Sequence, residues 1–361
     1  MPVLAQKLTH LSSASRFDLC VPGECLQMLS SSACVTYYRQ GSSCGRMLKV
    51  LMHGSCSYDC AYCPVRTDRH GYSFTPEELS KTFLSLYRQN RAGGLFLSSG
   101  IPHDVDRVMA DLIETARLLR FEGYDGYIHL KILPGAARTD ITEAARLANR
   151  ISINVETTGP SRLRALSGVK DYEQDIKKRL IWVAEAKPGH HTTQLVVGAA
   201  GETDAEILSC VSGLYRTVLP SRIYYSAFRA MPRTRLEDRP CTPAWRTNRW
   251  YQMDYLIREY GMQEEELRRV IGVDGTLADY DPKEILARSL QRIDPNYAPI
   301  EDLLRVPGIG PETAREIIRI RTGRPITYID TGPGRLIPGR AAPFLTIVPE
   351  RGRQATLAVF P

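Results

Sequence analysis

Three cysteines lie close together directly after an apolar segment. Cys56, Cys60 and Cys63 have the spacing C-x3-C-x2-C, and the apolar run from Met47 to Met52 before them predicts a strand. Thiolates are soft ligands that suit iron–sulfur clusters or zinc, and iron–sulfur clusters are usually held by four cysteines. Because no nearby cysteine follows Cys63, a cluster held by this loop would keep one iron open to another ligand.

Two other interpretations of the three cysteines are weaker. A zinc site needs a fourth ligand, and the local candidates His53 and His70 do not have zinc-finger spacing. A disulfide framework needs an even number of cysteines in a secreted protein, whereas three is odd and the sequence shows no sign of secretion. The spacing therefore favours an iron–sulfur cluster.

Strand and helix patterns alternate from about residue 46 to residue 228. The predicted strands are Arg46–Met52, Gly94–Ser98, Gly126–Ile132, Ile151–Val155, Thr192–Gly198 and Arg222–Phe228. The predicted helices between them are Pro76–Asn90, Asp104–Arg120, Thr139–Asn149, Tyr172–Lys187 and Asp204–Val218. Mostly apolar strands that alternate with helices predict an α/β fold with a parallel sheet wrapped by helices. Functional side chains are then expected at the carboxyl ends of the strands.

The cysteine motif resembles the signature of the radical S-adenosylmethionine (SAM) superfamily, which is C-x3-C-x2-C with an aromatic residue before the third cysteine. Tyr62 occupies that aromatic position. The resemblance implies a partial (β/α)6 TIM-like barrel, a 4Fe-4S cluster on Cys56, Cys60 and Cys63, and SAM bound to the open iron. It further implies a radical SAM enzyme that cleaves SAM reductively to a 5′-deoxyadenosyl radical, which abstracts hydrogen from the substrate.

The same resemblance implies SAM contacts near the strand ends. Ser98-Ser99-Gly100 stands where related enzymes have a Gly-Gly-Glu turn, so hydroxyls and backbone carbonyls must replace the glutamate. Asn154 and Glu156 match positions that contact ribose and methionine, and Gly198 begins a turn similar to the one that packs on adenine. The residues expected to bind SAM are Tyr62, Ser98, Ser99, Gly100, Asn154, Glu156 and Gly198.

Polar residues alternate along two of the predicted strands. His129 and Lys131 share one face of the third strand, as Ser152, Asn154 and Glu156 do on the fourth. Polar groups inside a closed barrel are costly unless they bind something. We favour a ligand role for Asn154 and Glu156, while His129 and Lys131 suit a ligand and an internal hydrogen-bond network equally well.

Two short helical patterns flank Pro307-Gly308-Ile309-Gly310 in residues 299–318, an arrangement that resembles a helix-hairpin-helix motif. Glycines permit a tight turn and uncover backbone N–H groups at the N-terminus of the second helix, which suits a phosphate. The expected packed underside consists of Leu304, Ile309, Ala314 and Ile317. The expected DNA contacts are Arg305, Gly308, Ile309, Gly310 and Arg315, with further charge from Arg319, Arg321 and Arg324. Residues 336–342 suggest a second, degenerate hairpin.

The composition is typical of a globular protein, and the net charge favours binding to a polyanion. The 361 residues are 43% hydrophobic and carry a net charge of +7, which favours a polyanionic partner without proving one. No apolar run approaches the roughly 20 residues that span a bilayer, so no membrane association is expected. Nine cysteines and no recognisable signal peptide predict a reducing compartment, which we take to be the cytoplasm.

Cluster motif and hairpin together resemble a family of radical SAM proteins assigned to DNA modification or repair, which are typically encoded beside a uracil-DNA-glycosylase-like partner. The resemblance implies an enzyme that acts on DNA, contacts its phosphates largely without regard to sequence, and receives electrons from a flavodoxin or ferredoxin. It names neither the substrate nucleotide nor the reaction. A radical SAM enzyme that modifies RNA and a non-catalytic, metal-stabilised DNA-binding protein remain alternatives.

The expected organisation has four parts. Residues 1–44 form a cysteine-containing cap, 45–230 the partial barrel, 231–298 a basic helical connector, and 299–361 the hairpin region. The catalytic residue stays unassigned, with Cys241, Tyr224 and Tyr225 as candidates, and so does the oligomeric state. The roles of Cys20, Cys25, Cys34, Cys44 and Cys241 are also unassigned.

Overall fold

The computed structural model describes residues 2–15, 35–40, 43–68, 70–326 and 338–346. The chain divides into two compact units, Met1–Thr247 and Asn248–Pro361, which are described separately below. Cys20, Cys25, Cys34 and the start of the suggested second hairpin lie outside the described residues. The four-part division expected from the sequence stays a prediction.

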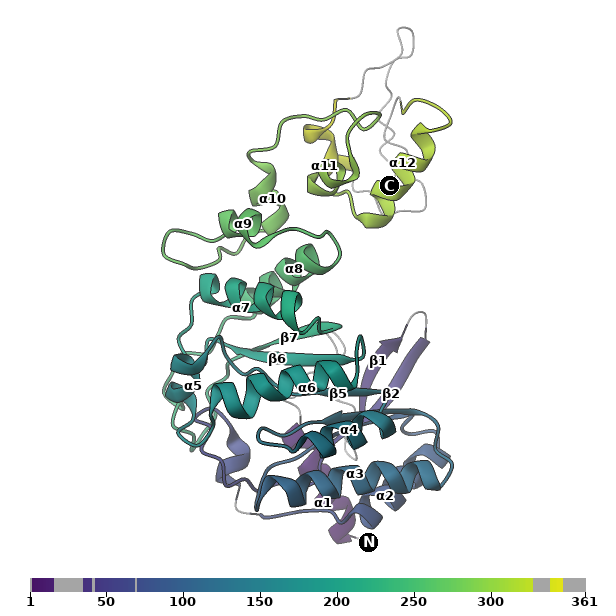
Figure 1. Ribbon diagram of the computed structural model, residues 1–361, viewed down its shortest axis with the longest axis vertical. Coiled ribbons are helices and arrows are strands. Elements are labelled where there is room, and N and C mark those ends of the chain that lie inside the picture. The colour runs from purple at the N-terminus through teal and green to yellow at the C-terminus, as the bar shows by residue number, and fades with distance from the viewer. Residues whose placement is uncertain (1, 16–34, 41–42, 69, 327–337, 347–361) are drawn as a thin grey trace. The chain divides into compact units, whose positions relative to one another are not determined.

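The first unit is built on one seven-stranded sheet whose strands follow in chain order (Figure 1). Strand β1 pairs antiparallel with β2, and all later neighbours are parallel. The six parallel strands confirm the predicted α/β fold of partial-barrel type. The strands are β1 (Val35–Gln40), β2 (Ser43–Leu51), β3 (Gly94–Ser98), β4 (Tyr127–Lys131), β5 (Arg150–Ser152), β6 (His191–Val197) and β7 (Arg222–Ala227).

Helices connect successive parallel strands, as in other parallel sheets. Helix α2 begins at a capping box in which the Thr75 hydroxyl and the Glu78 carboxylate satisfy each other's backbone N–H groups. Asp104 caps α3 in the same region, so two helix starts expected from the sequence are present. The helices are α1 (Pro2–Ala14), α2 (Pro76–Arg88), α3 (Val105–Phe121), α4 (Arg138–Leu147), α5 (Pro160–Leu166), α6 (Lys178–Ala186) and α7 (Asp204–Thr217). Short helical turns are η2 (Pro64–Thr67) and η3 (Tyr172–Lys177).

The elements depart from the sequence prediction around β5. This strand has three residues, because the Thr193 hydroxyl then accepts the Val155 N–H and donates to the Ile153 carbonyl, and only an isolated bridge from Glu156 to Leu195 continues the pairing. The helix expected over Tyr172–Lys187 begins as the π-helical turn η3 before it continues as α6. Such turns are frequent at functional sites. Helix α5 was not predicted, and it precedes the segment that carries a site residue described below.

The second unit is helical and packs around a small apolar core. Its helices are the later part of α8 (Ala244–Arg258), α9 (Glu264–Leu267), η4 (Arg268–Val270), α10 (Pro282–Ala287), α11 (Ile300–Arg305), α12 (Pro311–Arg321), α13 (Pro338–Ala341) and η5 (Ala342–Phe344). Leu303, Val306, Ile309 and Ala314 are fully buried in this core. Throughout the described parts of both units, no helix is both long and apolar enough to cross a membrane.

Arg120 should contribute strongly to the stability of the barrel, because its guanidinium joins the end of α3 to the elements that follow. It donates to the carbonyls of Leu147, Tyr124 and Gly126 at 3.0, 2.6 and 2.9 Å, and to Asn149 Oδ1 at 2.9 Å. Arg120→Met leaves these acceptors without their donor, and we expect the free energy of unfolding to fall by about 2 kcal/mol in urea titrations.

The matched control is Arg117→Met, three residues earlier on the same helix, where the exposed side chain pairs with Glu114 and Glu143. It should change stability by about 0.5 kcal/mol or less. Equal losses in the two variants would show that the Arg120 hydrogen bonds have no special weight.

Candidate active site

A cavity lies at the carboxyl ends of the parallel strands. Its walls include Leu51 from β2, Ser98 from β3, Lys131 from β4 and Val196 from β6. The three motif cysteines line the same cavity. Of the residues expected to bind SAM, the structure places these around it: Tyr62, Ser98, Ser99, Gly100, Asn154 and Glu156. Their contacts with SAM stay predictions, but one cavity brings them together with the cysteines.

The cysteine loop is held between the end of β3 and the end of α5. Ser57 donates its backbone N–H to the carbonyl of Ile101 at 2.7 Å, and Ala61 donates to Leu166 at 2.8 Å. The Asp59 carboxylate accepts from the Ser167 hydroxyl at 2.5 Å and from the Gly168 N–H at 2.9 Å. These contacts fix the loop backbone from both sides, so the cysteine positions are set by backbone hydrogen bonds.

Gly100 permits a close approach between the β3 end and the same loop. Its N–H donates to the carbonyl of His53 at 2.8 Å, and a Cβ added here would lie 2.3 Å from the Ser55 oxygen. Its own carbonyl accepts from the Ser99 hydroxyl at 2.6 Å. Gly100 therefore packs against the cysteine loop, and any contact with SAM is left to backbone atoms.

Burial alone would keep the cysteine thiols protonated. It raises the pKa of Cys63 to about 12, with the neighbouring sulfur of Cys60 adding to the effect, and it also raises the pKa of the Cys60 thiol. Cationic iron would stabilise the thiolate form that such buried sulfurs disfavour. Three sulfurs on one cavity wall fit a cluster that keeps one iron open, and the adjacent polar groups fit a polar ligand of that iron.

A buried ion pair joins the cysteine loop to the end of β5. Lys170 Nζ lies 2.9 Å from Glu156 Oε1, and both side chains are 6% exposed. The Tyr62 hydroxyl donates to Glu156 Oε2 at 2.6 Å, and Lys170 also hydrogen-bonds the Cys60 sulfur. Although burial opposes the charged form, the Glu156 carboxylate and the Cys60 sulfur hold the pKa of Lys170 above its ordinary value.

Lys170 is the site residue that the sequence analysis missed. It lies between α5 and η3, and Val169-Lys170-Asp171 has the composition of a solvated loop. No strand end or periodic pattern marks it, since its role depends on a carboxylate fourteen residues earlier in the chain. The network also shows that both carboxylate oxygens of Glu156 have partners within the protein, one the Tyr62 hydroxyl and the other the Lys170 ammonium.

The alternating polar residues of β4 and β5 pair with one another. His129 Nε2 lies 2.8 Å from the Ser152 hydroxyl, and burial holds the pKa of this imidazole far below its usual range. Of the two roles considered for His129, ligand contact and internal hydrogen bonding, the structure shows the second. Lys131 hydrogen-bonds Asn154 Oδ1, and both residues line the cavity, so a polar pair faces any bound molecule.

Gly198 lies apart from the other residues expected to bind SAM, since it does not line the cavity. Its φ is 90°, its N–H donates to the Glu202 carboxylate, and an added Cβ would lie 2.0 Å from Thr242 Oγ1. These constraints account for a glycine without a ligand, and the adenine contact stays a prediction. Cys241 is exposed, and its sulfur accepts the N–H of Ala230 at 3.3 Å.

Lys170→Met tests the importance of the buried ion pair. The variant leaves the Glu156 carboxylate buried without its cation, so we expect a loss of about 3 kcal/mol in stability and much weaker SAM binding. Iron content should stay at the wild-type level, because the three cysteines remain. The measurements are urea unfolding, iron per chain and SAM affinity.

The control for this variant is Lys178→Met, which removes an exposed lysine from α6. A double variant, Lys170→Met with Glu156→Gln, removes both charges and should regain most of the lost stability. If Lys170→Met keeps the stability and the SAM affinity of the wild type, the ion pair between Lys170 and Glu156 is an incidental contact.

Comparison with known proteins assigns part of the first unit to a family. Residues 50–212 match the family model described as the radical SAM superfamily. Solved structures with similar folds include HydG, a maturase of the [FeFe]-hydrogenase (TM-score 0.49, 12% identity, covering 58% of this chain and 49% of that chain). They also include HydG from Carboxydothermus hydrogenoformans (TM-score 0.43, 12% identity, 51% and 44%) and the cobalamin-dependent SAM radical enzyme OxsB (TM-score 0.36, 14% identity, 64% and 37%).

The matched part spans about half or less of the length of these solved structures. Comparison with curated proteins gave no match. The family model covers the cysteine loop, the ends of β2 to β6 at the cavity, and Lys170, while the end of β7 lies beyond the match. Residues 50–212 therefore form a radical SAM domain, and proteins of this superfamily use a 4Fe-4S cluster and SAM.

Proposed function

We propose that this protein is a radical SAM enzyme that acts on DNA, where it modifies or repairs a nucleotide. The observation that carries the proposal is the glycine turn between α11 and α12 in the second unit. Gly308 has a φ of 85°, and Gly310 is the residue before the first turn of α12, with Pro311 at the first helical position. The N-terminus of this helix is thus preceded directly by a residue without a side chain, Gly310.

The turn opens onto a groove. Gly308, Ile309 and Gly310 line it together with aromatic, polar and charged side chains, in which Asp281 pairs with Arg340. The other lining residues are Tyr251, Gln252, Tyr255, Leu256, Tyr260 and Lys283. The Ile309 side chain is fully buried, and its N–H donates to Val306 at 3.1 Å. Backbone groups of Gly308 and Gly310 therefore remain as the proposed phosphate contacts, since helix N-termini favour anions.

Apolar packing beneath the turn supports a rigid platform. Leu304, Ile309 and Ala314 are buried in the core of the second unit, and Ile317 packs against it, as expected for the underside of a hairpin. A rigid turn loses little conformational entropy on binding, which favours phosphate recognition through backbone groups.

A lysine approaches the turn from α10. Lys283 Nζ hydrogen-bonds the carbonyl of Ile309 and lies 4.5 Å from the centre of the Tyr260 ring. Burial lowers the pKa of Lys283 to about 7, although the nearby Asp281 carboxylate favours the charged form. Below this pH the ammonium adds positive charge beside the glycines, and above it that charge is lost.

The two arginines expected to contact DNA differ in their surroundings. Arg305 forms a two-bonded pair with Glu266 at 2.7 and 2.9 Å, so a phosphate would compete with a carboxylate. Arg315 is exposed and donates its Nε to the Pro311 carbonyl at 3.1 Å. Of the two, we propose Arg315 as the phosphate contact and assign Arg305 to holding α11 against α9.

Within the barrel, the proposed substrate nucleotide reaches the cavity at the strand ends. Cys56, Cys60 and Cys63 would hold the cluster, and Lys131, Asn154 and the Lys170–Glu156 pair supply polar contacts. When bound, cluster and SAM supply a radical that removes a hydrogen atom. Because a base or sugar within a duplex is shielded, we propose a single-stranded, damaged or flipped-out substrate.

The partners implied by the sequence belong to the same proposal. They are a uracil-DNA-glycosylase-like protein and a flavodoxin or ferredoxin as electron donor, and the proposed location is the cytoplasm. SAM cleavage by the reconstituted protein, measured with each candidate donor and with matched DNA and RNA, tests the electron donor and the nucleic acid. Stimulation by RNA alone would replace the DNA proposal with the RNA alternative.

A salt titration tests the hairpin. Because phosphate contacts release counterions, DNA affinity should fall steeply with salt and depend little on sequence. Replacing Gly308 and Gly310 together by Val should cost affinity, since side chains would cover the backbone and strain the positive φ of Gly308. Arg315→Ala should reduce the salt slope by about one contact.

The matched control is Gly323→Ala in the same unit, where an added Cβ meets its nearest neighbour at 3.8 Å. Iron content and SAM cleavage without DNA should be unchanged in all these variants. If the binding curves of the double variant superimpose on those of the wild type, the hairpin only packs, and the DNA proposal loses its main support.

The pH dependence of DNA binding tests Lys283. Its folded pKa of about 7 lies below the ordinary lysine value of about 10.4, so its charge is present at pH 6 and mostly lost by about pH 8. We expect wild-type affinity to fall as pH rises through this range at constant salt. Lys283→Met should remove that decrease, and an equal decrease in the variant would assign it to other groups.

The cluster cysteines give a final test of the catalytic half. Changing any of Cys56, Cys60 or Cys63 to Ala should abolish the visible absorbance of the cluster and SAM cleavage, because one iron loses its thiolate. Cys210→Ala, which removes a thiol of α7 that does not line the cavity, is the control. Zinc in equimolar amount without iron after anaerobic purification would contradict the cluster assignment.

A further inference from the structure

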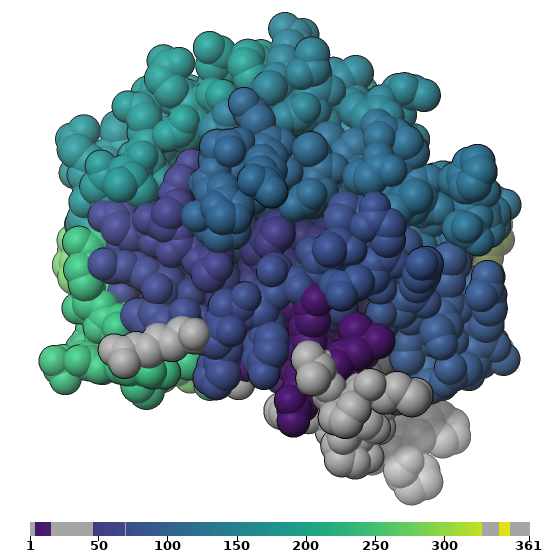
Figure 2. All heavy atoms as spheres, turned by 90° about the horizontal axis from the view of Figure 1, so that it is seen from below, coloured from purple at the N-terminus to yellow at the C-terminus, as the bar shows by residue number. Residues whose placement is uncertain are grey.

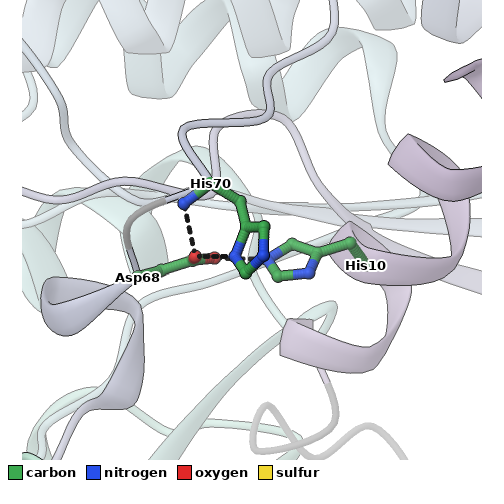
Figure 3. A group of neighbouring side chains, drawn as sticks. All are labelled: His10, Asp68 and His70. Atoms are coloured by element: carbon green, nitrogen blue, oxygen red, sulfur yellow. Dashed lines mark hydrogen bonds and ion pairs between the residues drawn. The ribbon is translucent and has the colours of Figure 1, made fainter.

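His10, Asp68 and His70 meet at one point of the first unit, away from the cysteine loop (Figure 3). His10 comes from α1, Asp68 follows the last residue of η2, and His70 lies two residues further on. One ligand atom from each residue lies within 4.8 Å of the others. Within the described ranges, no other group of three such side chains meets this condition.

The carboxylate of Asp68 is the centre of the group. Its Oδ1 accepts the backbone N–H of His70 at 2.9 Å and lies 2.9 Å from His70 Nδ1. Its Oδ2 contacts His10 Nε2. The ring centres of the two histidines are 4.8 Å apart, and Figure 3 shows both rings directed toward the carboxylate.

The surrounding structure fixes this geometry. Leu8 and Leu11 are buried on α1 and orient the helix, while Lys7 pairs with Glu78 and lies over the Phe74 ring. Tyr72 stacks on His70 with 5.9 Å between ring centres and meets His10 edge-on at 5.3 Å. Figure 2 shows α1, in purple, at the molecular surface beside the blue segments that follow the cysteine loop.

Two imidazoles and one carboxylate are a donor set for a borderline metal ion. Zinc binds histidine nitrogen and aspartate oxygen at about 2.0 to 2.2 Å, with water in an open fourth position. Magnesium and calcium favour sites made of oxygen, so the two imidazoles disfavour them. Asp68 is 12% exposed and His70 is 64% exposed, which leaves the group accessible to an ion and a water molecule from solvent.

We propose that His10, Asp68 and His70 form a second metal site, which binds one divalent transition-metal ion of the zinc type separately from the cluster. The ion joins α1 to the segment after Cys63, where η2 begins at Pro64. Ala14 at the end of α1 lines the cavity that holds the cysteines. Metal binding therefore fixes a helix that forms part of the active-site wall.

The test uses the whole 361-residue chain with its iron–sulfur cluster reconstituted, because empty cluster cysteines would also bind zinc. Zinc is titrated in competition with a chromogenic chelator, and bound zinc is counted per chain. Wild type should bind one zinc ion. His10→Ala with His70→Ala should weaken binding by at least about 100-fold, while iron content remains unchanged.

Asp68→Asn keeps the shape and the hydrogen bond to the His70 N–H but removes the charge, so it should also bind zinc weakly and remain folded. His190→Ala is the matched control, since this exposed histidine lies outside the group. Zinc should raise the thermal midpoint of wild type and of this control, because it binds the folded state alone. The double variant should show no such rise.

Wild type that binds no zinc with its cluster in place would overturn the proposal, and the group would then be a hydrogen-bonded clasp. Equal zinc affinity in wild type and the double variant would overturn it as well, because the ion would be held elsewhere. Neither result depends on the DNA proposal.

Discussion

The buried ion pair between Lys170 and Glu156 is the interaction on which the active site depends. It joins three segments that are distant in sequence, because Tyr62 and Cys60 of the cysteine loop bond to the same two side chains. An ion pair this buried repays its desolvation only when further hydrogen bonds satisfy both charges, and here Tyr62 and Cys60 supply them. The cysteine loop and the end of β5 are consequently positioned together, so a change in either moves the other.

Local patterns in the sequence were sufficient to predict the barrel. Apolar strands such as Gly94–Ser98, and caps such as Thr75 with Glu78, depend on neighbours within a few residues, and the structure contains both. Functional side chains of parallel sheets are expected at the carboxyl ends of the strands, and Ser98 and Asn154 line one cavity at these ends. The end of strand β5 was predicted too late, because no local pattern reveals that the Thr193 hydroxyl bonds to the backbone of Ile153 and Val155.

Long-range pairs were outside the reach of the same patterns. Lys170 sits in an ordinary-looking loop, and Arg305 meets Glu266 across thirty-nine residues, so neither partner is visible in a local window. His70 was considered only as a zinc ligand beside the cysteines, whereas the structure groups it with His10 and Asp68. In each case the tertiary fold, and not the residue type, decides which partner a charged side chain meets.

Two residues of the candidate sites, Glu156 and Gly308, have a positive φ. A residue with positive φ costs free energy unless it is glycine, so Glu156 persists in this state only because Lys170, Tyr62 and the bridge to Leu195 hold it. Glycine removes that cost at Gly308, where the proposed phosphate contact needs an open backbone. The two positions therefore differ in what makes a positive φ possible. At Glu156 the partners of the carboxylate stabilise the strained backbone, whereas at Gly308 the absence of a side chain removes the strain and leaves the backbone groups accessible.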